Sequence, residues 1–188
     1  DDIELKALQA ASLLHDVEKL SVREYLLSKP GALTEAEYDA DTLHPIHGAL
    51  IMTAVGFPYP VVPIVRHHHE RWDGRGYPDR LAGADIPLGA RIVAVVDCFD
   101  ALISDRPYRR KLSDEAAVEI LRARAGPFYD PAIVETFIEL IPALRRADAP
   151  SRAAPGARPA PFRPRCHHPP VGPPPHPRTP PRPSLAPA

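Results

Sequence analysis

Three consecutive histidines, His67 to His69, are the residues of this sequence best suited to metal chemistry. Imidazole is the commonest protein ligand for borderline transition metals. Three in a row point to different sides of the backbone, so we expect at least one to face inward. The glycines and proline of the following segment, residues 70–78, favour an irregular loop. The histidines are therefore predicted at a helix end beside a loop, where a metal site would be open. The alternative is a solvated polar helix end.

Two other places hold candidate ligands. His15 and Asp16 close a helix predicted over residues 2–15, and the leucines before them predict burial. A buried aspartate needs a positive partner, which a metal would supply. Asp97 lies in the middle of an apolar run, residues 88–104, where an unpaired carboxylate would be costly. The pattern favours a helix there, although residues 92–96 alone are compatible with a buried strand.

His44 is a further candidate because it precedes Pro45. Proline pushes the residue before it out of the α region, which can aim that side chain into a cleft. His47, three residues on, is interpreted as a bystander. A Thr34-Glu35-Ala36-Glu37 capping box predicts that the helix carrying His44 begins well before it.

Basic side chains near these ligands suit an anionic substrate. Lys19 lies one helical turn after His15, and a basic loop holds Arg106 and Arg109 directly after the Asp97 helix. Guanidinium groups bind phosphate oxygens in a bidentate manner, although a solvated loop is the alternative. Asp100, one turn beyond Asp97, is predicted to orient a ligand from behind.

The candidate ligands are imidazoles and carboxylates without a thiolate, which favours Fe or Mn over a structural zinc. Six ligands exceed one tetrahedral site and suggest two metal ions. Two close metals can clamp a phosphoryl oxygen and generate a hydroxide nucleophile. The residues alone therefore predict a metallophosphohydrolase on an all-α scaffold. The proposed ligands are His15, Asp16, His44, His68, His69 and Asp97.

The remaining helices are expected over residues 61–69, from a Ser113 cap to about 124, and from 131 to about 142. Of the 26 prolines, 15 lie between Pro150 and Pro187, and no acidic residue follows Asp148. Such a segment cannot pack as helix or sheet. We therefore expect a domain over 1–145 and a disordered Pro/Arg-rich tail over 146–188, acting as polyproline ligand, as tether, or without function.

Bulk properties exclude several classes of protein. A formal net charge of -1 gives no electrostatic footprint for a nucleic-acid polymer. Cys98 and Cys166 have no spacing for a zinc knuckle or disulfide framework. No apolar run approaches the ~20 residues that cross a bilayer. These features predict a cytoplasmic protein.

In combination, the motifs resemble the HD-GYP family of HD-domain phosphohydrolases. They are His15-Asp16 with Lys19, His44-Pro45, the segment 68–78, Asp97 with Asp100, and the segment 105–109. The resemblance covers roughly residues 3–142. It implies an all-α HD-domain bundle with two or three Fe or Mn ions, which would hydrolyse cyclic di-GMP to pGpG and GMP through a metal-bound hydroxide.

The resemblance also implies roles for single residues. The six ligands named above match metal-binding positions, with His15, Asp16, Asp97 and Lys19 as the catalytic group. Lys19, Arg106 and Arg109 match phosphate contacts, with Tyr77 near the substrate. Gly76-Tyr77-Pro78 matches the loop implicated in substrate access or in docking to diguanylate-cyclase domains.

Two departures from the family pattern shape the functional alternatives. The family carries an upstream histidine ligand, whereas no histidine precedes His15, so the domain is interpreted as N-terminally truncated. Glu18 stands where glycine is usual. The main hypothesis is a cyclic di-GMP phosphodiesterase. The alternative is a degenerate, non-catalytic module that binds nucleotide or a signalling partner. A hydrolase of other nucleotides is disfavoured by the Gly-Tyr-Pro loop.

Overall fold

The computed structural model describes residues 1–17, 42–105 and 109–148. Within these ranges the chain forms helices and no named strand, which confirms the all-α prediction and the helix over the Asp97 run. None of the described helices is long and apolar enough to cross a membrane. The helices are α1 (Asp2–Leu14), α4 (His44–Val55), α5 (Val61–His67), α6 (Leu88–Ile103), α7 (Asp114–Arg124) and α8 (Pro131–Asp148), with a short 3₁₀ turn η2 (Gly83–Asp85).

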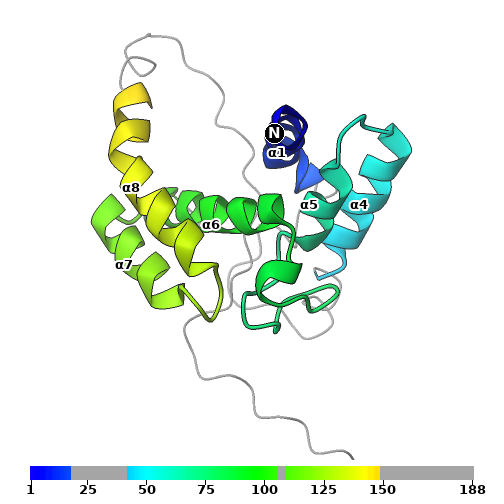
Figure 1. The fold of residues 1–188 in the computed structure, drawn as a ribbon. Helices are drawn as coiled ribbons and strands as arrows, with labels where there is room; N and C mark the ends of the chain where they lie inside the picture. The colour runs from blue at the N-terminus through cyan, green and yellow to red at the C-terminus, as the bar shows by residue number, and fades with distance from the viewer. Residues whose placement is uncertain (18–41, 106–108, 149–188) are drawn as a thin grey trace, which may run out of the picture.

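Helix α6 is the central element of the fold. Figure 1 shows it crossing the middle of the molecule, with α1, α4 and α5 on one side and α7 and α8 on the other. Its first half, including Val93, packs into a core shared with α1 and α5. Its second half, including Val95 and Cys98, packs into a core shared with α7 and α8. Asp97 therefore lies in the second half of α6, between Val95 and Cys98 of the second core.

Local signals explain where several helices begin. The Asp1 carboxylate accepts from the Glu4 backbone N–H and the Glu4 side chain reaches back, a capping box that starts α1. The Ser113 hydroxyl accepts from the Ala116 backbone N–H and caps α7, as predicted. Helix α4 begins at His44, after a turn at residues 42–43, so the prediction that the helix carrying His44 begins well before it is wrong. Pro45 is compatible with a first helical turn. The predicted capping box at 34–37 lies outside the described residues.

Helix α8 corrects the prediction that the last helix ends near Pro142. It continues through Pro142 to Asp148. A proline inside a helix removes one backbone donor and strains the preceding turn, so contacts on both sides must compensate. Ile141 is buried in the second core, and Arg145 forms a bidentate ion pair with Asp114 at 2.6 Å. The predicted domain boundary at 146 thus falls inside α8, and residues 149–188 lie outside the description.

Candidate metal centre

Four side chains from distant parts of the sequence converge beside α5. Asp16, His44, His68 and His69 each offer one ligand atom, and these atoms lie within 4.8 Å of one another. Asp16 Oδ1 is 3.7 Å from His44 Nε2 and 3.9 Å from His68 Nε2. All three histidines are buried. One carboxylate thus faces three buried imidazoles across a gap of the size a metal ion would fill.

Helix ends bring these residues together. Asp16 follows the end of α1, and His44 is the first residue of α4. The sequence predicted that α5 runs to His69, but it ends at His67, so His68 and His69 turn off the helix. This earlier end turns both imidazoles toward His44, and the ring centroids of His44 and His69 lie 4.7 Å apart. The prediction that at least one of the three histidines faces inward is confirmed.

His68 is held in the protonation state that binds a metal. Its Nδ1 lies 2.7 Å from the Val65 carbonyl oxygen, which can only accept, so Nδ1 carries the proton. Burial, reinforced by neighbouring His15, holds the pKa of His68 well below its usual range. Nε2 is buried and has no hydrogen-bond partner among the described residues. A main-chain carbonyl behind a neutral imidazole is the usual support of a histidine ligand.

His15 and Asp97 extend this cluster toward a cavity. His15 Nε2 lies 3.6 Å from Asp16 Oδ2 and 3.9 Å from Asp97 Oδ1. Both residues line a cavity of about 490 Å³ between α1 and α6, and Asp100 lines it one helical turn further along α6. The six predicted ligands therefore form one continuous group, buried at His44 and open at His15 and Asp97.

The donor set fits divalent metal ions. Oxygen and imidazole nitrogen donors without a thiolate suit Fe, Mn and similar ions. Buried polar atoms that point at one another without a bridging proton or cation would be costly. The orphaned Nε2 atom of His68 is the clearest sign of this arrangement. These residues would hold the ion or ions.

Comparison with known proteins agrees with this geometry. The sequence pattern of the HD domain family matches residues 1–133. The chain belongs to the HD domain family. Solved structures with the same fold include a cyclic GMP-AMP specific phosphodiesterase of V. cholerae, V-cGAP3. It has a TM-score of 0.60 and 21% identity, over 79% of this chain and 41% of the other. Bd1817, an HDG"Y"P protein from Bdellovibrio bacteriovorus, has a TM-score of 0.61 and 20% sequence identity. The match covers 76% of this chain and 45% of Bd1817.

Sequence relatives of this HD domain are named as phosphodiesterases of cyclic dinucleotides. The cyclic di-GMP phosphodiesterase response regulator RpfG of Xanthomonas campestris is 42% identical over 72% of this chain and 36% of its own length. A cyclic di-GMP phosphodiesterase of Thermotoga maritima is 38% identical over 71% of this chain and 37% of its own length. The 3'3'-cGAMP-specific phosphodiesterase 2 of Vibrio cholerae is 39% identical over 72% of this chain and 26% of its own length. The chain thus spans between 26% and 37% of the length of these relatives.

The predicted phosphate contacts of the HD-GYP domain are not gathered at the cluster in the described part of the chain. Lys19 and Arg106 lie outside the described residues. Arg109 is described, and its guanidinium donates to the carbonyl oxygens of Ala101 at 2.8 Å and Leu102 at 3.2 Å. These bonds satisfy carbonyls at the end of α6. The contact of Arg109 with phosphate stays a prediction. His47, which was interpreted as a bystander, is exposed on α4.

The Gly-Tyr-Pro loop, residues 70–79, packs directly on the histidines. The Tyr77 ring stacks on the His69 ring at 5.1 Å between centroids and meets His44 edge-on at 6.3 Å. The peptide bond between Tyr77 and Pro78 is cis. On the outer side, the Trp72 backbone N–H donates to the Phe128 carbonyl at 3.0 Å. The loop is therefore held between the candidate metal centre and the turn before α8.

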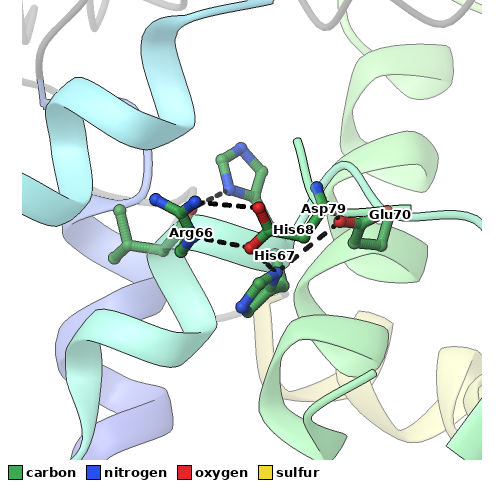
Figure 2. Close-up of polar contacts among 6 residues, drawn as sticks. Arg66, His67, His68, Glu70 and Asp79 are labelled. Atoms are coloured by element: carbon green, nitrogen blue, oxygen red, sulfur yellow. Dashed lines mark hydrogen bonds and ion pairs between the residues drawn. The ribbon is translucent and has the colours of Figure 1, made fainter. Parts of the chain in front are cut away.

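Four residues, Arg66, His67, Glu70 and Asp79, join the two ends of this loop; we call them the loop clamp. Arg66 donates to both carboxylate oxygens of Asp79, at 2.7 and 2.8 Å. The Asp79 backbone N–H donates to Glu70 Oε1 at 2.7 Å. His67 Nδ1 lies 3.6 Å from Glu70 and 3.7 Å from Asp79. Figure 2 shows these side chains converging.

Sequence reasoning did not assign these four residues a role. Arg66 and Asp79 are separated by 13 positions, so no helical spacing relates them. A loop lies between them, and their pairing depends on the path of that loop. The charge of Asp79 beside Arg66 is visible in the sequence only as one of many surface charges.

Exchanging the charges of Arg66 and Asp79 tests whether the loop clamp needs the ion pair itself or these two residues at these positions. Asp79→Arg places two guanidiniums together and should shift Tyr77 relative to His69. We expect it to lower the rate of any metal-dependent hydrolysis by the chain at least about tenfold. Arg66→Asp combined with Asp79→Arg should restore most of the loss. Stability should change by only about 1 kcal/mol or less, since both side chains are partly exposed. Steady-state kinetics and urea unfolding measure the two effects.

The lowered pKa of Asp79 predicts how the stability of the domain depends on pH. The hydrogen bond from Arg66 holds the pKa of this carboxyl below its usual range. The clamp therefore contributes stability at pH values above the ordinary aspartate pKa, and loses it as the pH falls through the lowered value. The Asp79→Asn variant should lack this acid-dependent component.

The charge exchange has its own contrary outcome. If Arg66→Asp combined with Asp79→Arg leaves kcat/KM as low as Asp79→Arg alone, the pair does not position the loop.

Proposed function

We propose that this HD-GYP domain hydrolyses a phosphodiester bond of cyclic di-GMP, to pGpG, to GMP or to both. The observation that carries the proposal is the buried donor set of Asp16 and three histidines, continuous with an open cavity through His15 and Asp97. Relatives named as phosphodiesterases of cyclic di-GMP or 3'3'-cGAMP support a cyclic dinucleotide as the substrate class.

The residues divide into three proposed tasks. The buried histidines and Asp16 would hold the ions, two or three of Fe or Mn. Such ions act as Lewis acids on a phosphoryl oxygen and lower the pKa of water. His15 and Asp97, at the cavity, complete the ligand set, and together with Asp16 and Lys19 they form the proposed catalytic group. Lys19, Arg106 and Arg109 would bind phosphate oxygens, and Tyr77 would close the substrate side of the histidines.

The chain's own geometry favours an enzyme over a binding module. Neutral His68, supported by the Val65 carbonyl, is arranged to donate an electron pair, a feature that partner docking does not require. Docking of a diguanylate-cyclase domain to the Gly76-Tyr77-Pro78 loop is a separate proposal. Gly76 is buried, so a partner would meet the part-exposed Tyr77 and Pro78.

The experiment is nucleotide chromatography of the purified chain with cyclic di-GMP, or with 3'3'-cGAMP, under anaerobic Fe(II) or Mn(II). We expect metal-dependent pGpG or GMP from cyclic di-GMP, with no product from Asp97→Ala. Asp85→Ala, which removes an exposed carboxylate of η2, is the matched control and should retain activity. A folded chain that binds metal and releases no product would contradict the enzyme and favour the binding module. Faster turnover of 3'3'-cGAMP would reassign the substrate.

A further inference from the structure

The cavity beside the candidate metal centre extends beyond the ligands. It lies between α1 and α6 and has a volume of about 490 Å³, within the range of small-molecule sites. His15 and Asp97 line it together with Gln9, which lies one and a half helical turns before His15. At ~1.5 Å of rise per residue, Gln9 is about 9 Å from His15 along the helix axis. The cavity is thus a slot that leads away from the metal ligands.

The walls of this slot are mainly apolar. Leu8 of α1 faces Ile92 and Val96 of α6 across the cavity. Neither lysine nor arginine is among the described residues that line it, and Asp97 and Asp100 add negative charge. Phosphate groups would be repelled there. A flat, neutral group with apolar faces would bury those faces between the two helices.

Gln9, an exposed residue of α1, adds a polar group to the slot beside Ser12. Its side-chain amide both donates and accepts hydrogen bonds, and it makes no such bond among the described residues. The Ser12 hydroxyl donates instead to the Gln9 backbone carbonyl at 2.8 Å. The amide of Gln9 is therefore available to a ligand that has a donor and an acceptor side by side on one edge.

We propose that this slot is a nucleobase subsite, in which a guanine base of the cyclic dinucleotide lies between α1 and α6. Gln9 hydrogen-bonds the polar edge of the base and determines specificity, while Val96 contacts its face. The proposal rests on the proposed function, because the phosphate attached to that nucleoside must lie at the His15 and Asp97 end. A base has two apolar faces and a polar edge, which matches the walls and the amide of this slot.

Two variants test the subsite by comparing substrates with and without a base. Gln9→Ala removes the amide, and Val96→Trp fills the slot from a position that is 42% exposed. With Mn(II), kcat/KM for cyclic di-GMP should fall about three- to tenfold in Gln9→Ala, mainly through KM. The fall should be at least tenfold in Val96→Trp. The kcat/KM for bis(p-nitrophenyl) phosphate, whose flat rings can enter the slot but have no donor beside an acceptor, should change little in Gln9→Ala.

Matched controls place the same changes elsewhere. Lys6→Ala removes a polar side chain from the exposed face of α1, and Leu50→Trp adds the same bulk to an exposed position of α4. Neither should alter the ratio between the two substrates. An equal loss for both substrates in Gln9→Ala, or no loss for cyclic di-GMP in either Gln9→Ala or Val96→Trp, would overturn the subsite.

A binding measurement tests the subsite without turnover. GMP and ribose 5-phosphate differ in the guanine base. In calorimetric titrations with Mn(II), Gln9→Ala and Val96→Trp should weaken GMP binding and leave ribose 5-phosphate binding unchanged. Equal affinities of the wild-type chain for the two ligands would overturn the subsite. If the wild-type chain turns over neither substrate, the proposed function fails, and this binding comparison still decides on the subsite.

Discussion

Asp16→Asn is expected to abolish metal-dependent stabilisation of the domain and to lower phosphodiesterase kcat/KM at least about 100-fold. Asp16 carries the carboxylate shared by His44 and His68, at 3.7 and 3.9 Å. Loss of an outer hydrogen-bond partner of a ligand already costs about 10- to 100-fold in metal affinity, so loss of a charged ligand should cost more. Asparagine keeps the size of the side chain, so the metal-free chain should fold.

The measurement is the rise in Tm on adding Mn(II), since a ligand that binds only the folded state stabilises it by mass action. The wild-type domain should show a rise that grows with metal concentration, and Asp16→Asn should show none in the same range. Asp85→Asn makes the identical chemical change at an exposed site and should behave as the wild type. An unchanged Tm rise in Asp16→Asn would remove Asp16 from the ligand set.

Gly76→Ala is the second change with a large expected effect. A Cβ atom at this position would meet the Arg71 backbone nitrogen and would lie 2.5 Å from Glu70 Cα. Backbone atoms cannot rotate away, so the Gly-Tyr-Pro loop must shift as a whole. We expect a loss of at least about 2 kcal/mol in the free energy of unfolding. Activity should also fall at least about tenfold, because Tyr77 would leave the His69 ring.

Gly89→Ala is the matched control for this clash. Its Cβ would lie 2.5 Å from Ile64 Cδ1 and 2.8 Å from Ile64 Cγ1, which are side-chain atoms rather than backbone. Rotation of that side chain can relieve the contact, and alanine gains helix propensity of up to about 1 kcal/mol over glycine in α6. Urea unfolding should therefore show a much smaller loss for Gly89→Ala. Equal losses for the two variants would mean that the loop can move away from residues 70 and 71 at little cost.

Much of the scaffold follows from local patterns in the sequence. Apolar periodicity and the Ser113 cap predicted α1, α6 and α7 to within about two residues of their observed ends, because these helices are fixed by short-range signals. The candidate ligands were also visible, because an aspartate within an apolar run, such as Asp97, or a run of histidines needs a partner. Their common location was inferred from their shared chemistry, since no helical periodicity relates residues that lie so far apart in the sequence.

Features that depend on tertiary packing were not predicted. Helix α8 passes through Pro142 because Ile141 and Arg145 are held by other helices, which no local rule reveals. The guanidinium of Arg109 donates to the Ala101 and Leu102 carbonyls in the last turn of α6, a contact that no local pattern indicates. The loop clamp of Arg66 and Asp79 depends on a loop path that only the folded structure defines.

The convergence of chain segments at Asp16, His44 and the His68-His69 pair has a consequence for the lifetime of the protein. These residues belong to three segments far apart in the sequence, so an ion held by them would act as a cross-link between α1, α4 and α5. Removal of the ion would release that cross-link and raise the population of opened states that proteases cleave. Metal supply would then set the abundance of the domain as well as its activity.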